Sequence, residues 1–184
     1  MTKTELRSLY LNRRNDIGDI SDYSKRLCDK FFQEVNLSNI GVIHIFLPIE
    51  DKNEIDTWEF LRRLWSDYSH IKTVVPVANF STRTMVSVEV NCDSVITANR
   101  YGIPEPEVVD VFDDKLIDLV LTPLLISDQY GFRVGYGGGF YDRFFSMNCK
   151  TEVIKVGLSF FSPISEISDI NKNDVPLDTC VFLS

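Results

Sequence analysis

The sequence predicts a single α/β domain in which a mostly parallel sheet packs between helices. Three observations predict this fold class. The chain has 184 residues, a typical length for one domain with a sizeable core. Several short stretches are apolar almost without interruption, as expected of strands that are buried on both faces of a parallel sheet. Helical stretches with one apolar face lie between them.

Helices are expected at Thr4–Arg14, Ser21–Val35 and Thr57–Tyr68, because apolar residues recur there at helical spacing. Thr4 and Ser21 are the expected N-caps of the first two helices. The expected strands are, in order, Gly41–Leu47, Thr73–Ala78, Met85–Val90, Asp118–Thr122 and, as the last strand, Val153–Leu158.

The composition excludes several classes of function. Apolar residues make up 44% of the chain and charged residues 25%, which is ordinary for a globular protein. The net charge is -8 and no basic block stands out, so we expect no nucleic-acid partner. No apolar run approaches the roughly 20 residues of a membrane span, and the charged amino terminus is unlike a signal peptide. We therefore expect a cytoplasmic protein without a membrane partner.

Cysteines and histidines do not form a recognisable site. Cys28, Cys92, Cys149 and Cys180 are far apart and include no Cys-x-x-Cys pair, so they are expected to be free thiols. His44 lies inside an apolar run and is expected to be a core histidine with satisfied hydrogen bonds. Neither a zinc site nor a Ser-His-Asp triad is indicated.

The most distinctive stretch is Gly131–Arg143, called the glycine-rich segment below. It holds five of the nine glycines of the chain. Glycine permits positive φ, so successive backbone N–H groups can converge on one anion. A helix that begins near residue 140 would direct its free N–H groups into the same space. Arg133 and Arg143 are suited to phosphate oxygens, and Asp142 is suited to a metal ion. The alternative is a flexible surface loop, but the flanking arginines and the upstream strand favour a phosphate site.

This segment fits neither common glycine fingerprint. No lysine lies between Arg133 and Arg143, as the Walker type requires, and the spacing lacks the final glycine of the dinucleotide type. Residues 135–142, Gly-Tyr-Gly-Gly-Gly-Phe-Tyr-Asp, instead resemble the Gly-x-Gly-x-Gly-Tyr-Tyr-Asp segment of the 5-formyltetrahydrofolate cyclo-ligases. That family couples ATP hydrolysis to the cyclisation of 5-formyltetrahydrofolate to 5,10-methenyltetrahydrofolate. The resemblance extends from Lys3 to Asp178 and implies a single three-layer domain over residues 1–184.

Two other stretches extend the resemblance in the first third of the chain. Lys3-x-x-Leu6-Arg7 is similar to the opening pattern of the family, whose lysine and arginine reach the ATP phosphates. Glu54 begins a Glu-Ile-x-Thr passage, which implies a glutamate that contacts the substrate near its formyl group. The local alternative is that Glu54 only complements the N-terminus of the following helix.

Two more stretches lie further along. Residues 99–106 contain two prolines and a glycine and are expected to be neither helix nor central strand. Tyr101 precedes a Gly-Ile-Pro-x-Pro loop there, and its ring is expected either to stack on a pterin or to pack within the loop. The second stretch, Asn173–Asp178, resembles the Asp-x-x-x-Asp tail of the family, which implies that Asp174 is a magnesium-binding aspartate. The chain departs from the family pattern at Asn173, where a histidine is common, and at Phe140, where the first tyrosine of Tyr-Tyr-Asp stands.

The resemblance thus implies a complete site, with ATP as co-substrate and Mg²⁺ as the metal. Its catalytic residues are Glu54 and Arg133, and its metal ligands are Asp142 and Asp174. The implied ATP-binding residues are Lys3, Arg7, Arg133, Val134, Gly135, Tyr136, Gly137, Gly138, Gly139, Phe140 and Tyr141. The implied substrate-binding residues are Leu47, Glu54, Tyr101 and Tyr136. The substrate is 5-formyltetrahydrofolate, with or without a polyglutamate tail.

The chemistry of that reaction needs no nucleophilic side chain. The resemblance implies that the formyl oxygen attacks the γ-phosphate, that N10 attacks the resulting phosphorylated imidate, and that phosphate then leaves. Phosphoryl transfer depends mainly on positioning and on charge neutralisation. Two alternatives come from other classes: a folate-binding protein of the same fold without turnover, and a sugar-phosphate isomerase or transferase on a similar sheet.

Overall fold

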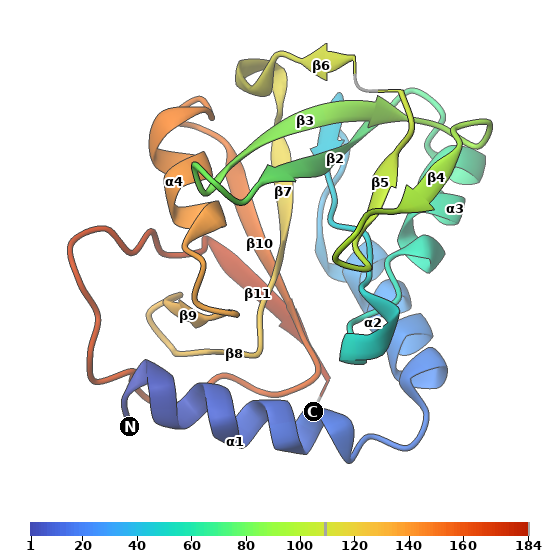
Figure 1. The fold of residues 1–184 in the computed structure, drawn as a ribbon. Helices are drawn as coiled ribbons and strands as arrows, with labels where there is room; N and C mark the ends of the chain where they lie inside the picture. Colours follow the sequence, from blue (N-terminus) through green and yellow to red (C-terminus); the bar gives the residue numbers. More distant parts are fainter. Residues whose placement is uncertain (109, 184) are drawn as a thin grey trace.

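The computed structural model in Figure 1 describes residues 1–108 and 110–183. Its helices are α1 (Lys3–Asn15), α2 (Ile20–Glu34), α3 (Trp58–Asp67) and α4 (Phe140–Met147), with 3-10 turns at Glu50–Lys52 and Asp114–Leu116. Its strands are β1 (Val42–His44), β2 (Lys72–Asn79), β3 (Thr84–Val90), β4 (Ile96–Ala98), β5 (Pro104–Pro106), β6 (Val111–Phe112), β7 (Leu119–Pro123), β8 (Ile126–Ser127), β9 (Arg133–Val134), β10 (Ile154–Ser159) and β11 (Thr179–Phe182).

The described residues form a seven-stranded sheet in the order β11-β10-β7-β1-β2-β3-β6. The pairings from β11 through to β2 are parallel, whereas β3 pairs antiparallel with both β2 and β6. Two small antiparallel sheets, β4-β5 and β8-β9, lie outside it. The parallel strands end at one edge of the sheet, where ligands bind in open α/β folds.

Helices cover both faces of this sheet, which confirms the expected α/β class. Because side chains alternate along a strand, Ile43 of β1 packs with α2 and α3, and its neighbour Val42 packs with α4. The same alternation places Leu119 and Val120 of β7 on opposite faces. Figure 1 shows α2 and α3 on one side of the sheet, α4 on the other, and α1 crossing below β8 and β9. The third apolar cluster joins α1 to this β8–β9 hairpin.

The predicted helix starts are wrong by a few residues. Thr2, not Thr4, caps α1: its hydroxyl accepts from the Glu5 N–H at 3.3 Å, and the Glu5 carboxylate accepts from the Thr2 N–H at 2.8 Å. This is a capping box, readable in the sequence as Thr-x-x-Glu. Asp19, not Ser21, caps α2 by accepting from the Asp22 N–H at 2.9 Å. A carboxylate three residues before the donor is the better acceptor in both charge and reach.

The predicted strands are present, with two corrections. Val153–Leu158 corresponds to β10 but is not the last strand, because β11 follows and pairs with it in parallel. The strand expected at Gly41–Leu47 is assigned only as β1, although the Ile45 N–H still donates to Val74 at 2.9 Å and the chain stays buried through residue 47. Residues 99–106 are neither helix nor central strand, as expected.

Within the described residues, no helix is both long and apolar enough to cross a membrane. The cysteines Cys28, Cys92, Cys149 and Cys180 are free thiols.

His44 is buried, as expected, but its hydrogen bonds are not satisfied. Its side chain is inaccessible to solvent, and neither ring nitrogen has a hydrogen-bond partner within residues 1–108 and 110–183. The ring packs against Phe144, with ring centroids 5.0 Å apart, and meets Tyr141 edge-on at 5.9 Å. Burial lowers the pKa of His44 to about 3, because a charge in this apolar layer would be poorly solvated.

We therefore predict that His44 makes the protein sensitive to mild acid. The unfolded chain binds a proton near the ordinary pKa of 6.5 and the folded protein does not, so stability is lost as the pH falls below 6.5. His44→Leu, of similar volume, should remove about 1 kcal/mol of the stability difference between pH 7.5 and pH 5.5. Denaturant unfolding at the two pH values measures this. An unchanged pH dependence in the variant would show that other groups cause the acid sensitivity.

Candidate active site

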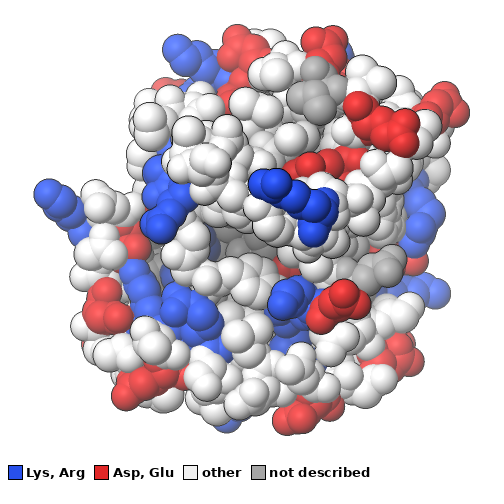
Figure 2. Space-filling view, viewed as in Figure 1, with Lys and Arg blue, Asp and Glu red and all other residues white. Residues whose placement is uncertain are grey.

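A cavity of about 1260 Å³ lies beyond the carboxyl ends of β1, β2 and β7. Leu47 follows β1, Ala78 lies near the end of β2, and Pro123 ends β7, and all three line the cavity. Figure 2 shows this face hollowed near its centre, with Lys and Arg side chains around the hollow. Pockets for one small ligand commonly measure about 300–1,000 Å³, so this cavity has room for two small molecules together.

The cavity is basic although the chain is acidic. Among the described residues, it is lined by the cationic side chains of Lys3, Arg7, Lys52, Arg83, Arg133, Arg143 and Lys172. Among the same described residues, the acidic side chains that line the cavity are Glu54, Asp142 and Asp174. An excess of cations in a protein of net charge -8 indicates a site for anionic ligands.

The glycine-rich segment forms one wall and ends in a helix, as the sequence predicts. Gly137 (φ 93°) and Gly139 (φ 66°) have left-handed backbone conformations, which other residues rarely adopt. Gly139 is the N-cap of α4 and has no side chain to accept from the first N–H groups of this helix. These N–H groups begin at Phe140, which lines the cavity. An uncapped helix start in a basic cavity is suited to a phosphate group.

Two arginines fix the glycine-rich segment to distant parts of the chain. From α1, Arg7 donates through Nε to the carbonyl of Gly135 at 2.8 Å. From α4, Arg143 donates to the carbonyl of Gly138 and, through Nε, to the carbonyl of Arg83 at 2.7 Å. Arg83 belongs to the turn between β2 and β3. The segment therefore has a defined shape before any ligand binds.

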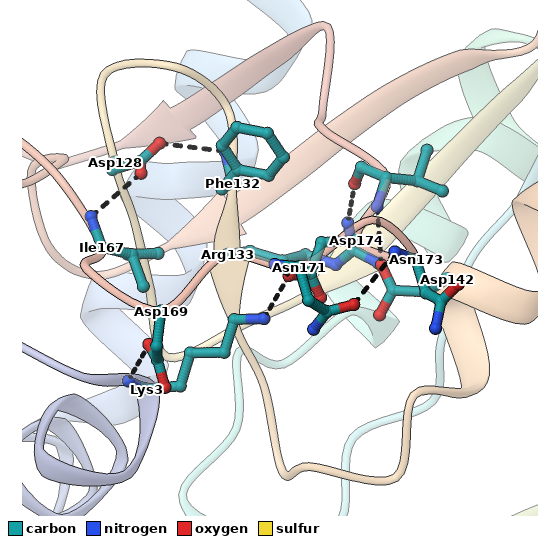
Figure 3. A network of polar contacts seen from close by, with 11 residues as sticks. Lys3, Asp128, Phe132, Arg133, Asp142, Ile167, Asp169, Asn171, Asn173 and Asp174 are labelled. Carbon is teal, nitrogen blue, oxygen red and sulfur yellow. Dashed lines mark hydrogen bonds and ion pairs between the residues drawn. The ribbon is translucent and has the colours of Figure 1, made fainter.

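The tail before β11 is joined to α1 by an ion pair and to the glycine-rich segment by hydrogen bonds, as Figure 3 shows. Lys3 pairs with Asp174. Arg133 donates to Asp142 at 2.7 Å and to the carbonyl of Val175 at 2.6 Å, while the Val175 N–H donates to Asp142 at 3.1 Å. Each acid lies next to a base, so the cationic side chains are held in place by the tail.

The two carboxylates expected to bind a metal line the same cavity. In the described part of the chain, no group of three or more His, Cys, Asp or Glu side chains gathers to hold a metal ion. The Oδ1 atom of Asp142 and the Oδ2 atom of Asp174 are engaged by the contacts just described, and their other carboxylate oxygens have no partner among residues 1–108 and 110–183. Mg²⁺ is commonly held by one or two carboxylates together with substrate phosphates and water. The residues present therefore fit a Mg²⁺ that arrives with a nucleotide.

Glu54 is buried in the wall of the same cavity. Its Oε2 accepts from the Ile49 N–H at 2.8 Å, and its Oε1 accepts from the Tyr136 hydroxyl at 2.7 Å. Neither oxygen contacts the first turn of α3, so the alternative that Glu54 caps this helix is not supported. Burial raises the pKa of Glu54, although both hydrogen bonds favour the ionised form. A buried carboxylate with a perturbed pKa in a cavity is typical of a functional site.

Most of the site predicted from the sequence lies together. The predicted residues that line the cavity are Lys3, Arg7, Leu47, Glu54, Arg133, Val134, Gly135, Tyr136, Gly137, Gly138, Gly139, Phe140, Tyr141, Asp142 and Asp174. Tyr101 does not line it: this ring is about half exposed and lies 4.8 Å, between centroids, from Phe80, which does. Phe80 also packs edge-on against Phe140 at 5.5 Å, so the residue that replaces the usual tyrosine has an aromatic neighbour.

Sequence reasoning missed several residues of the cavity wall. Lys52, Arg83 and Lys172 line it, but they lie in turns without a motif. Asp128 was also missed. It is buried, and its carboxylate accepts from the N–H groups of Phe132 at 3.0 Å and Ile167 at 3.1 Å (Figure 3), which fixes the turn that leads into β9. Its signal in the sequence was an aspartate before Tyr-Gly, as in many turns.

The comparison with protein families agrees with this geometry. The family model of the 5-formyltetrahydrofolate cyclo-ligase family matches residues 1–182. The chain belongs to this family. It is accordingly a ligase of folate one-carbon metabolism with 5-formyltetrahydrofolate cyclo-ligase activity, and the family implies ATP as co-substrate and 5-formyltetrahydrofolate as substrate.

Individual relatives and solved structures support the assignment. The chain is 30% identical over 142 residues to the 5-formyltetrahydrofolate cyclo-ligase of Escherichia coli (strain K12), covering 76% of each chain. It is 32% identical over 137 residues to that of Haemophilus influenzae, covering 73% of this chain and 72% of the relative. The fold of this cyclo-ligase matches the NMR structure of Aquifex aeolicus 5,10-methenyltetrahydrofolate synthetase with a TM-score of 0.81 at 20% identity, covering 99% of this chain and 90% of that one. A synthetase from Mycoplasma pneumoniae matches with a TM-score of 0.72 at 21% identity, covering 98% of each chain.

The glycine-rich segment of this cyclo-ligase yields a prediction about ATP. Alanine at position 137 would have to adopt an unfavourable positive φ, and its Cβ atom would lie 3.3 Å from the Arg7 guanidinium. Gly137→Ala therefore disturbs both the glycine-rich segment and the arginine that holds it. The backbone strain alone amounts to about 1–3 kcal/mol, so the KM for ATP should rise about tenfold or more. Steady-state kinetics with ATP varied measure this. Gly18→Ala is the matched control, because Gly18 has open space around it and lies away from the cavity. An unchanged KM for ATP in folded Gly137→Ala protein would contradict the assignment.

Proposed function

We propose that this cyclo-ligase holds ATP and 5-formyltetrahydrofolate side by side in its large cavity, transfers the γ-phosphoryl group to the formyl oxygen, and releases ADP and phosphate after ring closure. One observation carries the proposal: the same cavity is lined by an uncapped helix start among basic side chains and by the buried carboxylate of Glu54. The cavity volume fits two co-substrates.

We place the ATP phosphates against the glycine-rich segment. Their oxygens accept from the N–H groups of residues 134–141, while Lys3 and Arg7 approach from α1. Arg133 has five N–H donors, of which two are engaged with Asp142 and Val175, so donors remain for a phosphate oxygen. Charge-assisted hydrogen bonds of this kind neutralise the charge that spreads over the transferred group.

Asp142 and Asp174 are the residues that would hold a Mg²⁺ ion brought in with ATP. When bound, the ion would neutralise phosphate charge. Arg133 holds the Asp142 carboxylate of α4, and Lys3 holds the Asp174 carboxylate of the tail. The Asn173 that replaces the family's usual histidine leaves both of these pairs formed.

We place the substrate at the Glu54 end of the cavity. Its pterin ring contacts the apolar side chain of Leu47 and the ring of Tyr136, and the formyl group lies near the Glu54 carboxylate. Tyr101 remains a prediction as a stacking partner, and it contacts Phe80, which lines the cavity. The carboxylate of Glu54 favours the developing positive charge on the formyl-bearing nitrogen as its oxygen becomes phosphorylated.

The reaction then proceeds by two displacements. The formyl oxygen attacks the γ-phosphorus and ADP leaves, which gives a phosphorylated imidate. N10 attacks the imidate carbon and loses its proton, and the C–O bond breaks with release of phosphate to form the methenyl ring. The side chains bind, orient and neutralise charge, and none forms a covalent bond with the substrate.

The overall reaction is directly testable. Incubated with 5-formyltetrahydrofolate, ATP and Mg²⁺, the protein should produce a near-ultraviolet absorbance band from the conjugated methenyl product. One phosphate should be released for each ring closed, because the formyl oxygen leaves on the phosphoryl group. Product formation without nucleotide would contradict the coupling. Folded protein that binds the folate but forms no product would instead support a binding protein without turnover.

We predict that Glu54→Gln reduces turnover more than ATP binding. The amide keeps the shape of the side chain but lacks the charge, so kcat should fall about a hundredfold while the dissociation constant of ATP changes little. In the wild type, activity should fall as the pH falls through the raised pKa of Glu54, because the ionised form is required. The variant should lose this acidic limb of the pH profile. Glu89→Gln, at an exposed position of β3, is the control. A wild-type acidic limb in Glu54→Gln would remove Glu54 from the mechanism.

A second prediction concerns magnesium. Asp142→Asn and Asp174→Asn should each raise the Mg²⁺ concentration needed for half-maximal activity about tenfold, because a neutral amide is a poor ligand for this ion. A titration of activity against Mg²⁺ measures this, and the exposed Asp67→Asn on α3 is the control. Wild-type titrations in both cavity variants would place the metal elsewhere.

A further inference from the structure

Arg14 is a buried cation that the reaction as described above does not use. It lies in the last turn of α1, its exposed fraction is 4%, and it does not line the large cavity. Its side-chain hydrogen bond is to the Tyr136 hydroxyl, and its Nε has no partner among the residues that the structure describes. A buried guanidinium without a directly paired carboxylate is costly for a fold, so its place asks for another explanation.

The hydrogen bond between Arg14 and Tyr136 determines which group accepts the Tyr136 hydroxyl proton. Arginine can only donate, so the Tyr136 oxygen accepts from Arg14 and has its single proton left to donate. That proton goes to Oε1 of Glu54 at 2.7 Å. Burial raises the pKa of Tyr136, so its hydroxyl keeps the proton near neutral pH. The hydrogen bonds therefore run in one direction: Arg14 donates to Tyr136, Tyr136 donates to Glu54, and Glu54 is the ionised acceptor.

Arg14 is also electrostatically close to Glu54. Both side chains line a second, small cavity of about 10 Å³, together with Phe46 and Pro123. This volume has room for roughly one water molecule, so little shields one charge from the other. The other groups that bear on the Glu54 charge are Lys52, which favours ionisation, and the neutral Tyr136 and Tyr141 hydroxyls. Arg14 is therefore the buried cation that favours the ionised form of Glu54, which burial disfavours.

We propose that Arg14 is a positioning residue of the cyclo-ligase reaction, which keeps Glu54 ionised and oriented through the Tyr136 hydroxyl and holds Tyr136 against the substrate end of the cavity. This inference rests on the proposed role of Glu54. It also explains the contact of the guanidinium with the ring of Tyr136, whose centroid lies 5.4 Å from the Arg14 Cζ. Tyr136 belongs to the glycine-rich segment, so Arg14 couples the substrate end of the cavity to the phosphate end.

A role in α1 alone does not account for this position. A cation in the last turn of a helix complements its dipole, but the neighbouring Arg13 already does so from an exposed position. Arg13→Met and Arg14→Met remove the same charge from the same turn of α1. The pair is therefore matched in charge and place on the helix, but Arg13 is exposed over the Tyr10 ring, whereas Arg14 is buried against Tyr136 and near Glu54.

The test is the pH profile of kcat/KM for 5-formyltetrahydrofolate at saturating ATP and Mg²⁺. In Arg14→Met, the acidic limb should move up by about one pH unit, as expected when an opposite charge near a carboxylate is removed. Arg14→Lys keeps a charged, donor-only group and should restore at least half of this shift. Arg13→Met should keep the wild-type limb. An acidic limb in Arg14→Met that matches Arg13→Met would overturn the inference.

A second variant covers the case in which Arg14→Met does not fold, as checked by circular dichroism. Tyr136→Phe removes the hydroxyl that links Arg14 to Glu54 and leaves the ring in place, so it should move the acidic limb in the same direction. In the Tyr136→Phe background, Arg14→Lys should cause no further shift, because the link is already broken. A wild-type limb in Tyr136→Phe would overturn the inference, because the link from Arg14 to Glu54 runs through this hydroxyl.

Glu54→Gln, measured in the same series, separates the two levels of the argument. If the acidic limb persists in Glu54→Gln, the proposed function of Glu54 fails, and the role of Arg14 fails with it. If Glu54→Gln removes the limb while the Arg14 and Tyr136 variants leave it at the wild-type pH, only the inference about Arg14 fails.

Discussion

The structure of this site depends on how a segment with five glycines among thirteen residues is held in one shape. Glycines let the backbone turn toward an anion, but they offer nothing that packs. The contacts come instead from arginines: Arg7 of α1 holds one carbonyl of the segment, and the segment's own Arg143 and Arg133 bind another of its carbonyls and the tail before β11. The parallel sheet supplies the frame for these contacts, because it delivers the connecting chains to the same edge. Without these arginines, the five glycines would form a flexible loop.

The same contacts explain how an acidic protein maintains a basic cavity. Lys3 is paired with a carboxylate of the tail and Arg133 with a carboxylate of its own segment, so like charges are separated by acids. Around Glu54 the arrangement of charge is reversed, because the buried group is an acid and the groups that contact it are hydrogen-bond donors. The two ends thus have opposite polarity, which suits a phosphate donor at one end and a group that gains positive charge at the other. Tyr136, in the glycine-rich segment, joins the two ends.

The fold class and the main strands could be predicted from the sequence because they depend on local patterns, whereas most of the cavity wall could be predicted through the resemblance to the cyclo-ligases. Apolar runs mark the central strands, and the glycine-rich segment with its arginines marks the phosphate end. The errors have physical causes. Thr4 and Ser21 are wrong as helix caps because Thr2 forms a capping box with Glu5 and because the Asp19 carboxylate accepts from the start of α2. The strand β11 has only 4 residues and does not stand out in the sequence. The lack of hydrogen-bond partners at His44 could not be predicted from a sequence, because it results from tertiary packing. The place of Arg83 and Lys172 could not be predicted either, because only tertiary contacts bring them to the cavity.

The central claim is that both co-substrates occupy one cavity, with the phosphates at the glycine-rich segment and the formyl group near Glu54. A crystal structure of the protein with a non-hydrolysable ATP analogue, Mg²⁺ and 5-formyltetrahydrofolate tests it most directly. The account predicts the γ-phosphate at the start of α4, with the formyl oxygen facing it from the Glu54 end. A pterin bound outside the cavity, or a nucleotide whose phosphates lie away from Gly137 and Gly139, would contradict it.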